Sequence, residues 1–345
     1  MDWTRMRMEE DGRWYAYKDW YARKWSDTKS WAYARRRALV IWLVIVLLLL
    51  GYLFQFTTVF HPSRLYSISY QEQVARHNSL VSQKIWQILL PMPKKLKSKP
   101  VAFAEPSAWM QMNPGYTYTL FGTEGAVAFL QSRFPRRQDY LETFNELRNP
   151  GLKSDFLRYM VLYAEGGVYS DLDTRPEKPI DEWVPTDYET VARLVVGIEY
   201  DSLGGDIGKD YTYPVQFAQW TIAAAPEHSV FVNMTERCIR GLHELSEKYN
   251  TSLGEINSKD DEVLKATGPV AWTETVFEGI QVQAPELQSI SDLSGMKEPT
   301  LYGDILVLPI NGFGSGLPHS GSARWFTPKE ALTTHHSESS WRINS

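Results

Sequence analysis

The sequence has 345 residues, of which 43% are hydrophobic and 13% aromatic, a composition typical of a folded enzyme rather than a disordered chain. This length fits one large domain or two modest ones. The formal net charge of −5 argues against nucleic acid as the main partner, and the single cysteine, Cys238, excludes an internal disulfide framework and a cysteine-rich metal cluster.

An uncharged apolar run lies near the amino terminus. Residues 38–60 contain no charged side chain, and as a helix they would span roughly 34 Å, enough to cross a bilayer. Residues 1–37 are basic on balance; this segment fits either an amphipathic helix on a membrane surface or a solvated tail. Because basic flanks stay cytosolic, we expect a cytosolic tail at 1–37, one transmembrane helix at 38–60, a stem at 61–81 and a lumenal domain at 82–345.

Strand-like and helix-like stretches alternate beyond the stem. Strands are expected at residues 82–87, 116–121, 191–198 and 305–308. Helices are expected at residues 123–132, 137–147, 152–165, 216–225, 230–248 and 270–278. This alternation predicts an α/β fold with a mostly parallel central sheet covered by helices. No glycine-rich dinucleotide fingerprint follows a strand and no P-loop occurs, so the Rossmann dinucleotide and NTPase classes lack support.

The stretch 152–175 carries the candidate chemistry. Apolar residues recur at helical spacing over 152–165, and Gly166–Gly167 ends that helix because glycine adopts the positive φ of a helix terminus. A short β-prone segment then leads to Asp171 and Asp173, which strand periodicity places on one side. Two neighbouring carboxylates repel each other unless a cation lies between them, and hard divalent cations prefer oxygen ligands. A D-x-D triplet alone is common, but this order of elements is much more specific.

Asp155 and Arg158 lie three residues apart on the same predicted helix, so they share one face. Taken alone, they are typical of a surface ion pair. Together with the D-x-D motif they form a candidate site.

The order of helix, double glycine, strand and D-x-D resembles the donor-binding core of GT-A glycosyltransferases with the sugar-binding region containing the DXD motif, glycosyltransferase family 32. Within that family it is most similar to the fungal initiation-specific α-1,6-mannosyltransferase group. Further similar stretches follow in the family's order: SQKIWQ at 82–87, GIEY at 197–200, QFAQWT at 216–221, TGP at 267–269, GDILVLP at 303–309 and HHSESSW at 335–341.

The resemblance implies a GT-A nucleotide-sugar-binding fold and a role for each matching residue. Trp86 and Gln87 would border the base and ribose, although Trp86 also fits a core aromatic. Tyr169 would lie against the sugar or the ribose, and Trp341 would close the cleft.

The resemblance also implies a metal and a sugar site. Asp171 and Asp173, joined by His336, would hold Mn²⁺ with the diphosphate. Asp155 and Arg158 would contact the donor's sugar hydroxyls.

The family transfers mannose from GDP-mannose with retention, which implies α-1,6-mannose addition to an N-glycan outer chain or mannan acceptor on a glycoprotein in the Golgi membrane. No carboxylate in the sequence identifies itself as an enzyme nucleophile, so the route of retention stays open. Two alternatives remain. One is an assembly role beside other mannosyltransferases in a mannan polymerase complex, and the other is mannose transfer to inositol phosphoceramide. Proteins of the second kind have further membrane segments after the catalytic domain, and none is visible here.

Overall fold

The computed structural model describes residues 35, 39, 41–46, 79–91, 104–256, 260–316, 320–323 and 326–336. The chain divides into two units, Met1–Ser69 and Tyr70–Ser345. The described residues of the first unit are helical, with exposed apolar side chains at Leu39 and Trp42. In the part that is described, no helix combines the length and the apolar character needed to cross a membrane. Most of the tail, anchor and stem segments lie outside the described residues, so those assignments stay predictions.

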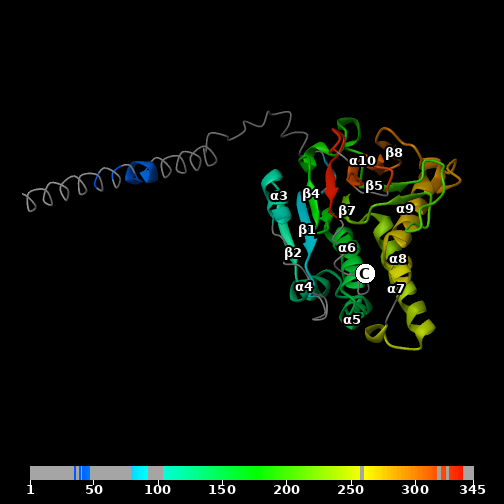
Figure 1. Cartoon of the computed structure of the whole chain (residues 1–345). Helices are drawn as coiled ribbons and strands as arrows, with labels where there is room; N and C mark the ends of the chain where they lie inside the picture. Colours follow the sequence, from blue (N-terminus) through cyan, green and yellow to red (C-terminus); the bar gives the residue numbers. More distant parts are fainter. Residues whose placement is uncertain are drawn as a thin grey trace, which may run out of the picture. The chain divides into compact units, whose positions relative to one another are not determined.

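A mixed sheet of eight strands forms the centre of the second unit (Figure 1). The strands are β1 (Lys84–Ile88), β2 (Thr117–Phe121), β3 (Gly167–Ser170), β5 (Leu194–Asp201), β6 (Val215–Phe217), β7 (Thr221–Ala224), β8 (Thr300–Tyr302) and β9 (Ile305–Leu308). Their order is β2-β1-β3-β7-β5-β9-β8, with β6 added beside β5. The prediction of an α/β fold is confirmed.

The prediction of a mostly parallel sheet is wrong. The pairs β1–β2, β1–β3 and β5–β9 are parallel. In contrast, β7 runs antiparallel to both of its neighbours, β3 and β5, and the pairs β5–β6 and β8–β9 are also antiparallel. The strand direction is therefore reversed at β7 in the centre of the sheet. Strand β7 lies beside β3, which leads to the D-x-D motif.

The predicted helix at residues 216–225 is also wrong, because this segment forms β6 and β7. All residues of both strands are buried. A short run buried on both faces has no polar face to reveal its period, so apolar content alone does not separate a strand from a buried helix.

Helices pack against the sheet. They are α3 (Ala104–Met112), α4 (Thr123–Arg133), α5 (Gln138–Glu146), α6 (Pro150–Glu165), α7 (Ser229–Tyr249), α8 (Asp260–Ala266), α9 (Pro269–Gln283) and α10 (Ile310–Phe313). Single 3-10 turns lie at Ile180–Glu182, Thr186–Tyr188, Leu253–Glu255 and Ile290–Leu293. Helix α6 packs on α7, and α7 packs on α9. The helices predicted over 123–132, 137–147, 152–165, 230–248 and 270–278 are confirmed, with shifts at their ends.

The connection from α6 to β3 depends on two glycines, as predicted. The Asn149 side chain caps the start of α6 by accepting hydrogen bonds from two backbone N–H groups of its first turn. At the other end, Gly166 and Gly167 have φ of 61° and 90°, which glycine adopts at little cost. A Cβ at Gly167 would lie 2.6 Å from the carbonyl oxygen of Lys84. The glycines therefore let β3 enter the sheet beside β1.

A second, two-stranded sheet joins the carboxyl-terminal part of the chain to the D-x-D region. Strand β10 (Thr333–His335) pairs antiparallel with β4 (Thr174–Pro176). His335 lies opposite Thr174 in this register, and the backbone N–H of His336 donates to the carbonyl of Asp173 over 2.9 Å. The pairing thus brings a segment some 160 residues away in sequence to the carboxylates.

Candidate functional site

Asp171 and Asp173 lie in the turn between β3 and β4 rather than within a strand. The backbone N–H of Thr174 donates to the carbonyl of Asp171 over 3.2 Å and closes this turn. The two carboxylates lie close together, as expected. The cause is the turn after β3, whereas the prediction relied on the alternation of side chains along a strand.

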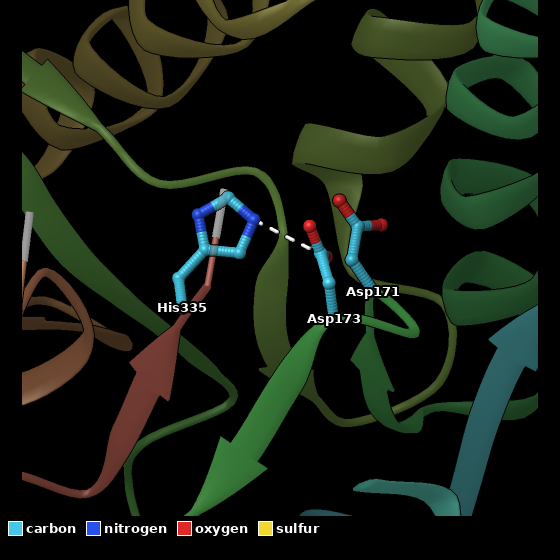
Figure 2. Close-up of side chains that lie close together, drawn as sticks. All are labelled: Asp171, Asp173 and His335. Atoms are coloured by element: carbon cyan, nitrogen blue, oxygen red, sulfur yellow. Dashed lines mark ion pairs between the residues drawn. The ribbon is translucent and has the colours of Figure 1, made fainter. Parts of the chain in front are cut away.

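His335 completes a cluster with the two carboxylates. One ligand atom from each of Asp171, Asp173 and His335 lies within 4.8 Å of the others. Figure 2 shows the imidazole facing both carboxylates, with Nε2 of His335 3.2 Å from Oδ1 of Asp173. Burial lowers the pKa of His335, but the hydrogen bond to Asp173 and the nearby acidic groups outweigh it and raise that pKa. The imidazole also stacks on Trp220, with ring centroids 4.5 Å apart.

The structure places the predicted histidine, His336, elsewhere. Its side chain is about half exposed, and its Nε2 lies 3.6 Å from Oε1 of Glu105. Successive residues of a strand point to opposite sides, so the register that directs His335 to the carboxylates directs the next residue away from them.

Arg158 lies at the centre of the site and is not part of a surface ion pair. Its Nη2 is 2.9 Å from Oδ1 of Asp155 and 3.3 Å from Oδ1 of Asp171. Nη1 donates to the carbonyl of Gln219 over 3.0 Å, and the guanidinium lies 4.6 Å from the centroid of the Tyr169 ring. The Arg158 side chain is only 4% exposed. One guanidinium therefore holds both carboxylates and fixes their relative position.

The two carboxylates beside Arg158 are buried and have perturbed pKa values. Burial raises the pKa of Asp155 to about 7, although Arg158 and the hydroxyl of Thr267, 3.0 Å away, act in the opposite direction. Burial also raises the pKa of Asp171, against the charge of Arg158 and a hydrogen bond donated by the Tyr169 hydroxyl. Buried groups with such shifts are concentrated at functional sites.

The remaining predicted residues fall in different places. Gln87 reaches the site: its Nε2 donates to the carbonyl of Asp171 over 3.0 Å. Trp86 points into the core instead, where its ring stacks on Phe121 and its Nε1 donates to the carbonyl of Gly166. Trp341 lies outside the described residues.

Three contributors to the site were not identified from the sequence. Gln219 and Trp220 lie in the segment taken for a helix, and Tyr118 donates to Oε1 of Gln87 over 2.6 Å. Correct placement of β6 and β7 would have revealed the first two, because the residues between them face the turn after β3: the backbone N–H of Asp171 donates to the carbonyl of Trp220 over 2.8 Å.

The donor set fits a divalent cation. Asp171 and Asp173 offer hard oxygen ligands and His335 offers one imidazole nitrogen, a combination that suits Mn²⁺. Other polar atoms beside the cluster are buried: Nε of Arg158 and Nε1 of Trp220 have no hydrogen-bond partner among the described residues. A bound ligand with oxygen acceptors would satisfy both.

Comparison with known proteins agrees with this site. Residues 105–189, which include the cluster's two aspartates, match the family described as "Glycosyltransferase sugar-binding region containing DXD motif". The chain is 34% identical to the "Initiation-specific alpha-1,6-mannosyltransferase" of Schizosaccharomyces pombe over 237 residues, 68% of this chain and 58% of that protein. It is 28% identical to the protein of the same name in Candida albicans, over 82% of this chain and 80% of that one.

Other matches are shorter or weaker. The chain is 35% identical to "Mannosyl phosphorylinositol ceramide synthase SUR1" of Saccharomyces cerevisiae, over only 21% of this chain and 18% of that protein. Among solved structures, the "PaToxG Glycosyltransferase" aligns with 62% of this chain at a TM-score of 0.36, which is too low to support a conclusion.

The sugar-binding region and the long matches relate the chain to known glycosyltransferases. It belongs to the family whose sugar-binding region contains the DXD motif, here Asp171–Leu172–Asp173.

Proposed function

We propose that this glycosyltransferase is a retaining α-mannosyltransferase. It transfers mannose from GDP-mannose to a mannosyl acceptor, forming an α-1,6 linkage on an N-glycan outer chain or on mannan. The observation that carries the proposal is the cluster of Asp171, Asp173 and His335 beside the buried Arg158, in a chain whose long matches are to proteins named initiation-specific α-1,6-mannosyltransferases.

In this proposal each part of the site has a defined task. Asp171, Asp173 and His335 hold Mn²⁺, which when bound supplies positive charge to the departing diphosphate. Arg158 keeps Asp155 and Asp171 in place through its two ion pairs. Asp155 accepts a hydrogen bond from a hydroxyl of the donor sugar, which fixes the sugar's orientation.

The proposal also includes a GT-A type fold and the cellular setting. The segment 38–60 anchors the chain in the Golgi membrane as a single-pass type II protein, with the catalytic domain and its glycoprotein acceptor in the lumen. Tags at both ends of the chain test this setting. Only the amino-terminal tag should be accessible to antibody after selective permeabilisation of the plasma membrane.

Mannose transfer to inositol phosphoceramide is the less favoured enzymatic alternative. The match to the ceramide-modifying relative covers 21% of this chain, whereas the matches to the two initiation-specific enzymes cover 68% and 82%. The other alternative is a role mainly in assembly within a polymerase complex, which would leave the glycans unchanged in the variant Asp173→Asn.

The test is mannosyl transfer by the purified full chain. GDP-mannose and Mn²⁺ are supplied with α-1,6-mannobiose, a high-mannose glycan or inositol phosphoceramide, and products are identified by mass spectrometry and linkage analysis. The proposal predicts transfer to a mannoside and no transfer by the variant Asp173→Asn. Transfer to the ceramide alone, or equal transfer by Asp173→Asn, would contradict it.

A further inference from the structure

Strand β5 ends in two buried carboxylates with different surroundings. Asp201 is 5% exposed and fully engaged: it accepts hydrogen bonds from the backbone N–H groups of Leu203 and Gly295 and from the hydroxyl of Ser294. Glu199 is 4% exposed, but among the described residues it accepts only one hydrogen bond, from Nε2 of Gln216. The carboxylate of Asp201 thus has its hydrogen bonds satisfied within the protein. In contrast, one carboxylate oxygen of Glu199 accepts no hydrogen bond from the described residues.

Four polar atoms on Gln216 and on segments that approach Glu199 are buried without a partner among the described residues. They are Oε1 of Gln216, Oγ of Ser315, Oγ1 of Thr333 and Nε1 of Trp220. Burying a polar atom is costly unless it forms a hydrogen bond. Such a group of atoms at the edge of a candidate active site indicates that a ligand supplies the missing hydrogen bonds.

The contacts between elements place these residues together. A Cβ on Gly314 would lie 3.3 Å from Cα of Glu199, so the end of α10 touches β5 there, and Ser315 follows directly. Ser315 forms a β-bridge with Thr334 of β10. Thr333 and His335 lie two apart on that strand and share a side, and His335 stacks on Trp220.

Glu199 is also within electrostatic reach of the metal cluster. Burial raises the pKa of Glu199 to about 7, against the hydrogen bond from Gln216 and the charge of His335. Glu199 comes from β5, whereas Asp155 and Asp171 come from α6 and the end of β3. Glu199 therefore approaches His335 from a different strand than the carboxylates of the metal cluster.

We propose that Glu199, oriented by Gln216, binds the acceptor sugar by accepting a hydrogen bond from one of its hydroxyls beside the donor site. This rests on the proposed transfer reaction and assigns its second substrate. The free atoms comprise a carboxylate oxygen, an amide oxygen, two hydroxyls and an indole N–H, which complement the alternating donors and acceptors of a neutral sugar. Glu199 is not part of the metal cluster of Asp171, Asp173 and His335, so no bound cation would offset its repulsion of the donor's diphosphate.

The variant Glu199→Gln isolates this role. The new amide oxygen can still accept from Gln216, while the amide nitrogen replaces the free oxygen, so shape is kept and the open acceptor atom is lost. We expect KM for the mannoside acceptor to rise about ten- to hundredfold, the range for losing a hydrogen bond to a charged group. KM for GDP-mannose and the Mn²⁺-dependent hydrolysis of GDP-mannose without acceptor should stay at wild-type values.

Asp201→Asn is the matched control on the same strand. It is expected to lower the melting temperature, because three hydrogen bonds meet at Asp201, and to leave the acceptor KM unchanged. Gln216→Ala provides a second variant that removes the orienting amide. It should also raise the acceptor KM, and it decides the matter if Glu199→Gln does not fold.

The outcomes separate this inference from the proposed function. Wild-type chain that turns over no GDP-mannose overturns both. Wild-type turnover with an unchanged acceptor KM in Glu199→Gln and Gln216→Ala overturns only the acceptor role. The same holds if these variants lose donor hydrolysis and acceptor transfer to the same extent, because Glu199 would then serve the donor site or the fold.

Discussion

Arg158 is the residue on which the candidate site depends most. Its guanidinium pairs with Asp155 and Asp171 while its side chain is 4% exposed. Removing one partner of a buried ion pair leaves an uncompensated charge, which costs far more than the loss of an exposed pair.

The variant Arg158→Met should therefore lower the free energy of unfolding by about 3–5 kcal/mol at pH 8. The loss should be smaller at pH 5. Burial already raises the pKa of Asp155 to about 7 and raises that of Asp171, and without Arg158 both should rise further. A carboxyl with a raised folded-state pKa stabilises the fold below its unfolded pKa and loses this contribution as pH rises through its folded pKa.

Urea unfolding at the two pH values measures this difference. Arg137→Met is the control, because Arg137 forms ion pairs with Asp139 and Glu236 at the surface, and exposed pairs contribute only about 0–1 kcal/mol. If Arg158→Met lowers the free energy of unfolding equally at pH 5 and pH 8, the charges of Asp155 and Asp171 are not the cause of the destabilisation.

At the scale of elements, the α6–β3 connection fixes where the D-x-D turn begins. Gly167 has φ of 90°, and a Cβ there would lie 2.6 Å from a backbone oxygen of β1. Both the backbone conformation and the neighbouring strand thus require glycine.

Gly167→Ala should lower the free energy of unfolding by at least about 2 kcal/mol, through backbone strain and the clash. Gly125→Ala in α4 is the matched control. Its Cβ would meet only a side-chain atom of Phe121 at an ordinary 3.5 Å, and alanine in a helix is favoured over glycine by roughly 0.5–1 kcal/mol. Thermal unfolding of the two variants tests the requirement for glycine at position 167. Similar melting temperatures for Gly167→Ala and Gly125→Ala would refute it.

The elements that the sequence predicted well carry local signals. Helix α6 was predicted from its apolar spacing and its terminal glycine pair, and the structure confirms both. The strands β6 and β7 were missed because burial on both faces hides their period. The D-x-D turn was taken for a strand end, although the pairing of its two carboxylates was correct.

At the scale of the whole molecule, the site is assembled from segments far apart in the sequence. Residues 155–173 meet Gln219 and Trp220 because β7 lies beside β3, and they meet His335 because β10 pairs with β4. The sequence located the acidic half of the cluster through motif order. The resemblance implied His336, whereas His335 faces the carboxylates, because that choice depends on the register between two strands more than 150 residues apart.

The measurement that tests the account most directly is the Mn²⁺ dependence of GDP release from GDP-mannose. It compares the full chain with its variants His335→Ala and His336→Ala. The structure predicts that wild type and His336→Ala are half-activated at similar Mn²⁺ concentrations, whereas His335→Ala requires more than about tenfold higher Mn²⁺. GDP release that does not depend on Mn²⁺, or a raised Mn²⁺ requirement in His336→Ala alone, would contradict the assignment of Asp171, Asp173 and His335 as the metal site.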